Sequence, residues 1–503
     1  MHGADAAPLR ALDGRETAVL TRTPIAATRL RYLADDPAPF GAAHLARNPK
    51  TELADDPADR SAVEVLAADD IDRLLRHPDA DVLFAACATV VAAVPPAGAE
   101  ALDRRLKALA EHGFEIVELQ PSDAQRGYFD DRATNLAPAW RAGALPADAS
   151  IETLIVVAVR AGGRAPLHLR LITFAPTLMD IRTRLPAEAM RTEADLIVTH
   201  EKVPSPLPAL PVDEPKISVL QRPAAMEPKA WRDAIAARAK AGWIVVLEYD
   251  DHPELVARVR NRTLGPDDWL RFSHVHAVQT STPPLVKLFG QHNPQVRMLP
   301  NAVFRLEPFP ERLPRRVFYG AVSRGPFAAG VAATLGPVIE EFPDVEFVVV
   351  GDQAVFDALP TQRKQLRGYM PFDEYLQLMA TCAVSLSPIE GSEHQETKSD
   401  AKYLDGAARG VLTIASPTIY SGVMRHGRNG LIAQTVADWA PLLARALRDE
   451  EASRVMARNA WDYVAGARMF ADQIRDRHDW YRDLWARRDE LNAALFKRFE
   501  AIP

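Results

Sequence analysis

The sequence predicts an α/β protein with two doubly wound halves. From about Val82 onward, strand-like apolar runs alternate with helix-like runs, which indicates βαβ units and parallel sheets. These runs are apolar on both faces, as strands covered by helices on both sides should be. The alternation is interrupted once, by the proline-rich stretch 293–321, and then restarts. We therefore expect an interdomain connection there, and ligand sites beyond the carboxyl ends of the strands, in a cleft between the halves.

Length and composition restrict the class of protein. A chain of 503 residues is too long for a single core, so several domains are expected. Its 48% apolar and 25% charged content is typical of soluble globular proteins. The net charge of −7 gives no general support for nucleic acid or an anionic membrane as partner. Any anion site must therefore come from a local cluster.

The sequence also indicates where the protein works. Its most apolar stretch, Val82–Val94, is shorter than the roughly 18 residues that a membrane-spanning helix needs. The N-terminus has no basic start followed by an apolar core, so no signal peptide is expected. We predict a cytoplasmic protein and leave peripheral association with the inner membrane open. Cys87 and Cys382 lie in apolar runs and are interpreted as buried hydrophobic residues.

The chain divides into four predicted parts. Residues 1–75 are rich in Ala, Asp, Arg and Pro with weak periodicity, so loose helices or partial disorder are expected. An N-terminal Rossmann-like domain is predicted for residues 76–305 and a C-terminal one for residues 306–465. Helices fill residues 466–503 and are expected to pack back on the N-terminal domain. Expected strands are 82–91, 114–120, 153–159, 167–174, 194–200, 216–221, 243–249, 275–280, 316–321, 345–352, 365–370, 383–388, 411–416 and 430–433.

The stretch KSDAKYLDGAARGVLTIASP combines a charged helix start with a buried strand. Ser399 or Thr397 is predicted to cap the helix, and Lys398 lies at its start, where free N–H groups suit a phosphate. Lys398, Lys402 and Asp405 are spaced by four and three residues and should share one face. Such a face suits a nucleotide, with the cations on diphosphate and the carboxylate on ribose hydroxyls. An exposed amphipathic face is the alternative.

A second candidate segment, VFYGAVSRGP, follows a predicted strand. Gly320 lets the backbone approach a ligand closely, and Ser323 and Arg324 follow it. An arginine there can pair with phosphate through two parallel hydrogen bonds. The alternative is an ordinary turn between strand and helix with a surface arginine.

Acidic and histidine side chains follow a strand of the first half, in VVLEYDDHPEL. Asp250, Asp251 and His252 stand where residues facing a cleft belong. Asp251 also fits as the cap of the helix that follows, with Asp250 or His252 facing the cleft. At another strand end, residues 280–282 are predicted to cap a helix, and a polar contact facing the cleft is the alternative.

The loop SPIEGSEHQETKSD carries Glu390, Glu393, His394 and Glu396. The spacing of these side chains matches no common metal-binding pattern. We expect a polar loop that faces the ligand, and no metal.

These segments together resemble a known family. VFYGAVSRG, FVVVGD, LRGYMPFDEYLQLMATCAVSLSP, KSDAKYLDGAARGVLTIASP and HGRNGLIA resemble the C-terminal domain of GT-B glycosyltransferases of family 4, or glycosyl transferases group 1. The match covers about residues 316–464. KSDAKYLDGAARG is similar to the corresponding stretch of bacterial surface-polysaccharide transferases. ISVLQRP, GWIVVLEYDDHPEL, VQTSTPPL and LPNAV resemble the N-terminal half of that subgroup. The chain before about residue 150 lies outside the resemblance.

The resemblance implies a GT-B fold and transfer of a sugar from a nucleoside diphosphate sugar to the hydroxyl of a glycan or lipid-linked acceptor. It implies that Arg324 and Lys398 stabilise the leaving diphosphate without a metal, and that the configuration of the sugar is retained. Asp405 matches the second of two family glutamates and would contact the ribose. Thr397 stands where the first is expected, with Glu396 beside it.

Two other functions for the fold, and an interaction role for the N-terminal 80 residues, stay open on the sequence alone. The changes at positions 397 and 405 fit a non-catalytic binding or scaffold protein on the same fold, although the retained Arg324 and Lys398 favour a phosphate site. A sugar-nucleotide epimerase is the other alternative. If the protein is a glycosyltransferase, Asp250 or His252 would position the acceptor or stabilise positive charge on the sugar.

Overall fold

The structure is a computed structural model of the chain. It describes residues 25, 27, 29–34, 36–54, 61–121, 136–144, 153–160, 165–174, 180–191, 193, 195–202, 207–208, 210–259, 261–321 and 324–501. The α/β prediction is confirmed, since the described residues form helices and three six-stranded sheets, largely parallel. They fall into two compact units: unit 1 comprises residues 1–247, 274–276 and 473–503, and unit 2 comprises residues 248–273 and 277–472. The predicted domain boundaries stay predictions.

Unit 1 begins with a separate sheet, which was not expected from the sequence. Its strand order is β2-β1-β3-β4-β6-β5. β1, β2, β3 and β4 pair in parallel, whereas β6 runs antiparallel to both β4 and β5. The strands are β1 (Arg29–Leu33), β2 (Glu52–Leu53), β3 (Val63–Ala68), β4 (Cys87–Val94), β5 (Phe114–Pro121) and β6 (Leu154–Arg160). The helices are α2 (Ala38–Leu45), α3 (Ile71–Leu75), α4 (Ala80–Ala85), α5 (Ala99–Glu111) and α6 (Ala137–Arg141).

Two expectations for this region were wrong. Residues 1–75 were expected to form loose helices or to be partly disordered, whereas the part of this stretch that the structure describes supplies β1, β2 and β3, with Leu30 and Leu66 fully buried. In place of the expected strand 82–91, the chain forms the end of helix α4 and then strand β4. A short apolar run suits a buried helix and a buried strand equally, which explains the second error.

The remainder of unit 1 is an α/β layer. Its strands lie in the order β10-β9-β7-β8, with β7 parallel to both β8 and β9. They are β7 (Leu167–Thr173), β8 (Leu196–Glu201), β9 (Lys216–Gln221) and β10 (Ile244–Glu248). The helices are a π-helix (Asp180–Arg184), α7 (Leu185–Met190), α8 (Pro228–Lys240), α20 (Ile474–Ala486) and α21 (Arg488–Ala501). α20 is held by Arg482, whose guanidinium lies 2.7 Å from Asp195 and donates to the Ala165 carbonyl oxygen.

Unit 2 opens with residues that follow β10. They form α9 (Pro253–Val259), a 3₁₀ turn (Pro266–Trp269), α10 (Leu270–Ser273), β11 (Ala277–Thr280), α11 (Pro283–Gly290) and β12 (Val296–Met298). β11 and β12 pair in parallel.

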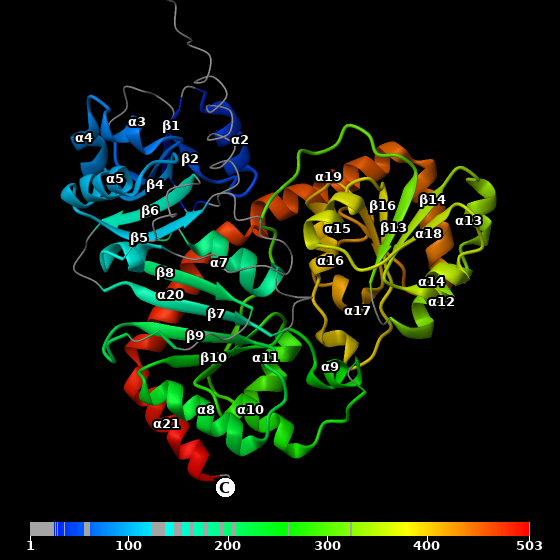
Figure 1. The fold of residues 1–503 in the computed structure, drawn as a ribbon. Coiled ribbons are helices and arrows are strands. Elements are labelled where there is room, and N and C mark those ends of the chain that lie inside the picture. Colours follow the sequence, from blue (N-terminus) through cyan, green and yellow to red (C-terminus); the bar gives the residue numbers. More distant parts are fainter. Residues whose placement is uncertain are drawn as a thin grey trace, which may run out of the picture. The chain divides into compact units, whose positions relative to one another are not determined.

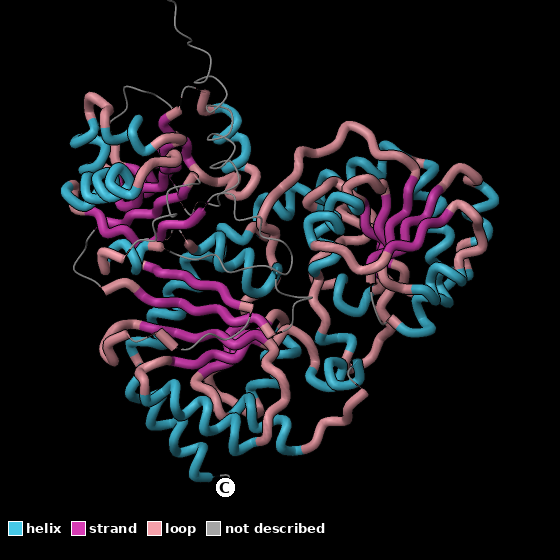
Figure 2. The backbone as a smooth tube through the Cα atoms, viewed as in Figure 1, coloured by secondary structure: helices cyan, strands magenta, loops and turns pink. Residues whose placement is uncertain are grey.

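The main sheet of unit 2 has the order β15-β14-β13-β16-β17-β18, and its neighbouring strands pair in parallel. Figure 2 shows these strands side by side with helices around them. Its strands are β13 (Arg316–Gly320), β14 (Glu346–Val350), β15 (Lys364–Arg367), β16 (Val384–Ser387), β17 (Leu412–Ala415) and β18 (Leu431–Ile432). Its helices are α12 (Gly325–Ala333), α13 (Gly336–Glu341), α14 (Gln353–Ala358), α15 (Phe372–Met379), α16 (Ala401–Ala407), α17 (Pro417–Tyr420), α18 (Trp439–Arg448) and α19 (Glu450–Ala467). Short 3₁₀ turns cover Gln395–Thr397, Val436–Asp438 and Phe470–Gln473.

Helices cover both faces of this sheet (Figure 1). Along β13, Val317 and Tyr319 pack on one face in a cluster with residues of α12, α13 and α18. Phe318 lies on the other face beside Met379 of α15. Burial on both faces is the reason why these strands read as continuous apolar runs.

Gly410 makes a tight packing contact ahead of β17. It has a φ of +69°, and a Cβ there would lie 2.6 Å from Cδ of Pro310. Both the left-handed backbone and the missing side chain are therefore required at this turn.

Two further observations concern the cysteines and whether any helix could cross a membrane. Both cysteines are buried and free, as the sequence indicates. In the part of the chain that the structure describes, no helix has the length and apolar character that crossing a bilayer requires.

Candidate functional site

Two candidate residues, Lys402 and Gly320, meet at the carboxyl edge of the unit 2 sheet, where β13 ends, together with Tyr375. The Lys402 ammonium, on α16, donates to the carbonyl oxygen of Gly320 and lies 3.4 Å from the hydroxyl of Tyr375. Tyr375 also donates to the Gly320 carbonyl oxygen, at 3.2 Å. A Cβ at Gly320 would lie 2.5 Å from the Phe318 ring and 2.7 Å from the Tyr375 ring, so only glycine fits.

Arg324 stands at the start of α12 and has an incomplete set of partners. Its Nη1 donates to the side-chain oxygen of Gln395 at 3.2 Å. Its Nε is buried and has no hydrogen-bond partner among the described residues. A buried N–H of a permanently charged group without an acceptor is costly, so this donor indicates a missing acceptor.

Electrostatics near Arg324 favour an anion. Burial, and then the charge of Arg324, lower the pKa of Lys402 to about 8, although Asp405 opposes this shift. Burial raises the pKa of Asp405 to about 6, against the attraction of Arg409 and Lys402. Cations crowded together in a poorly solvated place gain stability from a bound anion.

The local structure of the KSDAKYLDGAARG stretch differs from the prediction. A 3₁₀ turn covers Gln395–Thr397 and α16 begins only at Ala401, with Asp400 at the N-cap and no side-chain cap bond. Neither Ser399 nor Thr397 caps the helix, and Lys398 lies before it. Lys402 and Asp405 therefore share the predicted helix face, and Lys398 does not.

Lys398, Ser399 and Thr397 make other contacts instead. The Lys398 ammonium is 2.6 Å from the Asp251 carboxylate. Ser399 accepts a hydrogen bond from the side-chain amide of Asn301 at 2.8 Å. Thr397 is buried, and its hydroxyl donates to the His394 carbonyl oxygen at 2.7 Å.

A buried ion pair supports the start of α16. The two terminal nitrogens of the Arg468 guanidinium, Nη1 and Nη2, contact the Asp400 carboxylate at 2.6 and 3.1 Å. Nη2 also donates to the Asn301 carbonyl oxygen. Neighbouring Val303 and Met469 form a parallel β-bridge. These contacts hold the linker, the end of α19 and the start of α16 together.

The acidic stretch after β10 also has defined contacts. His252 is 7% exposed and packs edge-on against His394, with ring centroids 4.4 Å apart. The Asp250 backbone carbonyl accepts from the Ser281 hydroxyl. Thr282 occupies the N-cap position of α11 as expected, but its hydroxyl makes no cap bond and donates instead to the Thr397 carbonyl oxygen at 3.0 Å.

Two predicted residues do not join the cluster. Glu396 is exposed, and Ser323 lies outside the described residues. The roles predicted for Asp250, His252 and the other named residues stay predictions. Sequence reasoning missed Tyr375, Gln395 and Arg409. Tyr375 sits in an amphipathic helix and Arg409 after a run of small residues, so neither carried a signal beyond packing.

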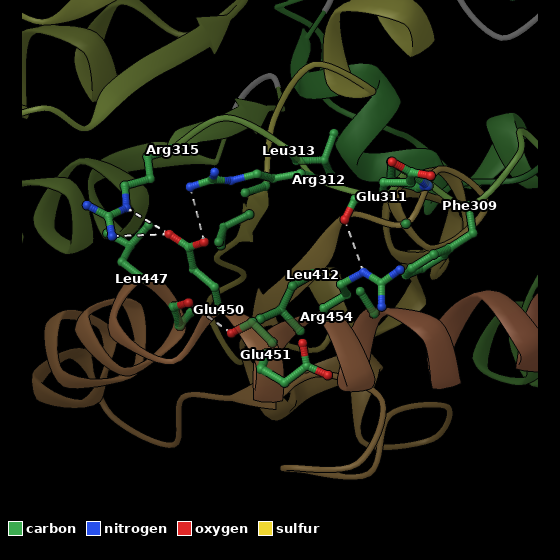
Figure 3. Close-up of a pocket in the computed structure, with 17 residues that line it drawn as sticks. Phe309, Glu311, Arg312, Leu313, Arg315, Leu412, Leu447, Glu450, Glu451 and Arg454 are labelled. Carbon is green, nitrogen blue, oxygen red and sulfur yellow. Dashed lines mark hydrogen bonds and ion pairs between the residues drawn. The ribbon is translucent and has the colours of Figure 1, made fainter.

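A cavity of about 240 Å³ lies at the opposite, amino-terminal edge of the same sheet (Figure 3). Its charged groups largely pair with one another. Glu450 lies between Arg312 and Arg315, at 3.6 and 3.1 Å, and Arg454 donates to the Glu311 carbonyl oxygen (Figure 3). None of these paired groups resembles the Nε of Arg324, which is buried without a hydrogen-bond partner among the described residues.

Comparison with known proteins gives structural matches only. No family model and no curated protein matches the chain. Anabaena HepE in complex with UDP-glucose matches 62% of this chain and 98% of its own, at 13% identity and a TM-score of 0.44. Sucrose-phosphate synthase from Thermosynechococcus elongatus matches 64% and 99%, at 14% identity and a TM-score of 0.45. TarM matches 53% of this chain at 11% identity and a TM-score of 0.40, and the match spans 54% of TarM.

Proposed function

We propose that the chain is a glycosyltransferase that moves a sugar from a nucleoside diphosphate sugar to an acceptor hydroxyl. The observation that carries the proposal is the unpaired, buried Nε of Arg324 beside Lys402, at the carboxyl edge of a parallel sheet. Ligands of such sheets bind at that edge. A diphosphate supplies the acceptor that Arg324 lacks and the negative charge that offsets both cations.

The same residues account for the chemistry of the leaving group. As the bond between sugar and diphosphate breaks, negative charge grows on the phosphate oxygens, and fixed cations in a dry site stabilise it strongly. Arg324 and Lys402 would do this without a metal. Lys398 would join them by exchanging its Asp251 partner for phosphate. Asp405 would accept a hydrogen bond from the ribose. Gly320 keeps the backbone close enough for these contacts.

The acceptor side rests on Asp250 and His252. We assign them to positioning the acceptor hydroxyl or stabilising positive charge on the sugar. We further propose retention of the sugar configuration and a glycan or lipid-linked acceptor in surface polysaccharide or lipopolysaccharide synthesis. These finer assignments rest on the family resemblance.

Calorimetry with UDP, GDP and dTDP, carried out with and without a chelator in the buffer, tests the donor site directly. We expect one of them to bind with a 1:1 stoichiometry, and the matching nucleotide sugar to be slowly hydrolysed when acceptor is absent. Inorganic phosphate serves as the control for unspecific anion binding. If none of the three nucleotides binds, the proposal fails; binding with no turnover of any nucleotide sugar would point to a binding protein instead.

The affinity for the nucleoside diphosphate is expected to depend on pH through Lys402. Its pKa is about 8 in the free protein, so the ammonium that attracts phosphate is present below pH 8 and is lost as the pH rises. Bound diphosphate favours the charged form. Affinity should therefore fall between about pH 8 and pH 10, with proton uptake on binding in that window. Calorimetry in buffers of different ionisation enthalpy measures this uptake, and Lys402→Arg should remove it. A pH-independent affinity over this range would contradict the assignment.

A further inference from the structure

Three potential metal ligands meet in unit 2 although they come from distant parts of the chain. His252 and Glu254 lie at the start of α9, and His394 lies in the loop before α16, 140 residues after Glu254. One ligand atom from each lies within 4.8 Å of those of the other two. Neither stretch has a recognisable metal-binding spacing by itself, which is why the sequence predicts no metal.

We propose that His252, Glu254 and His394 form a binding site for a divalent transition-metal ion of the zinc type, with the fourth position open to water. The site is separate from the diphosphate cations Arg324 and Lys402. It does not depend on the proposed transfer reaction, and with His252 bound to the ion the acceptor-side role falls to Asp250 alone.

The donor set selects this class of ion. Two imidazoles and one carboxylate are a recurrent three-ligand set for Zn²⁺ and other first-row ions. Mg²⁺ and Ca²⁺ take oxygen ligands almost exclusively, so a site with two histidine ligands binds them weakly. Magnesium is therefore the appropriate negative control.

The present hydrogen bonds show how little must move. His394 Nε2 and the Glu254 carboxylate are 2.8 Å apart and share a proton. Ligand atoms about 2.0–2.1 Å from a tetrahedral zinc are separated by roughly 3.3 Å, so the ion would replace this proton with a small displacement. His252 Nδ1 accepts a bond from the Glu254 backbone N–H at 3.2 Å. That bond is long, and metal binding would release it.

Burial and charge also suit a metal. His252 is 7% exposed, whereas His394 and Glu254 are 25% and 42% exposed, which leaves a path for ion entry. Burial first, and then the neighbouring His394, lower the pKa of His252, which favours the neutral ring that metal binding requires. The Arg258 guanidinium lies 3.8 Å from Glu254 and is 65% exposed, so it competes weakly.

The expected role of the ion is to fix the loop that contains Gln395 and Thr397 against the start of α9. Gln395 holds Arg324, and Lys398 follows within the same segment. The metal would thus order this loop without taking part in bond breaking.

Cobalt titration of the untagged full chain, freed of metal by a chelator, tests the site. Co²⁺ should saturate at one equivalent and give the visible absorption of a tetrahedral nitrogen and oxygen site. Zn²⁺ should displace it and raise the melting temperature, whereas Mg²⁺ should do neither. Absence of a visible Co²⁺ band at millimolar metal would overturn the proposal.

Matched variants distinguish this site from scattered surface histidines. His394→Ala and Glu254→Gln should each weaken Co²⁺ binding at least about tenfold. Glu254→Gln changes a half-exposed side chain, so it keeps the test valid if the histidine variant does not fold. His77→Ala is the control, because His77 Nδ1 accepts an N–H from Asp79 in the same local arrangement as His252. Unchanged Co²⁺ binding in Glu254→Gln, or equal loss in His77→Ala, would refute the assignment.

Discussion

Replacing Arg324 with alanine is expected to reduce turnover of the nucleotide sugar by about 10²–10³-fold, because a fixed donor to the developing charge is lost. The unliganded protein should lose little stability, because the variant gives up the bond from Arg324 to Gln395 but also removes a buried N–H that has no acceptor among the described residues. Steady-state kinetics with the donor identified by calorimetry measures the effect. A lower kcat with little change in fold separates this role from a structural one.

Two variants make the Arg324 result specific. Arg324→Lys keeps the charge but loses the planar fork, so it should fall between wild type and alanine. Arg315→Ala removes an arginine of the same unit that pairs with Glu450 at the other edge of the sheet, and it should leave turnover unchanged. Equal activity of Arg324→Ala and Arg315→Ala would contradict the phosphate role.

Replacing Asp400 with alanine is expected to destabilise unit 2 by about 3–5 kcal/mol, the usual cost of breaking a buried ion pair. Arg468 and Asp400 are only 13% and 14% exposed, so the guanidinium would keep its charge with two remaining neutral acceptors, the Asn301 carbonyl and the Tyr463 hydroxyl. The urea midpoint, followed by pulse proteolysis, measures the loss.

A double-mutant cycle shows whether the loss belongs to the pair. Asp400→Ala combined with Arg468→Met removes both charges, so the double variant should be more stable than the sum of the two single losses implies. Strict additivity would mean that the two side chains act independently. The exposed pair Arg448–Glu341 is the control, and its disruption should cost less than about 1 kcal/mol.

The fold of unit 2 was largely predictable from the sequence because its strands are short apolar runs between helices. β13, β14, β16 and β17 all lie within expected strands. Unit 1 was harder. The antiparallel strand β6 has the same fully buried pattern as a parallel one, so composition does not reveal its direction. Weak periodicity likewise hid β1 and β3, whose burial depends on distant neighbours.

The candidate site was predictable in outline and not in its contacts. The position after a strand drew attention to Arg324, and helical spacing drew attention to Lys402 and Asp405; the structure brings the three side chains near one another, and their roles stay predictions. The prediction that Lys398 lies on the same helix as Lys402 was wrong. Lys398 precedes the first residue of α16 and forms an ion pair with Asp251. The meeting of His252 with His394 depends on tertiary structure alone, and no spacing rule could have shown it.

The contact between Gly410 and Pro310 has a consequence for the evolution of this protein. A side chain at position 410 would overlap the proline ring and would also have to adopt a left-handed backbone. Homologues that lose the proline relieve the overlap but not the backbone demand, so asparagine is the first replacement to expect. Position 410 should therefore vary only in lineages where position 310 has already changed, and the order of the two substitutions should be readable from a phylogeny.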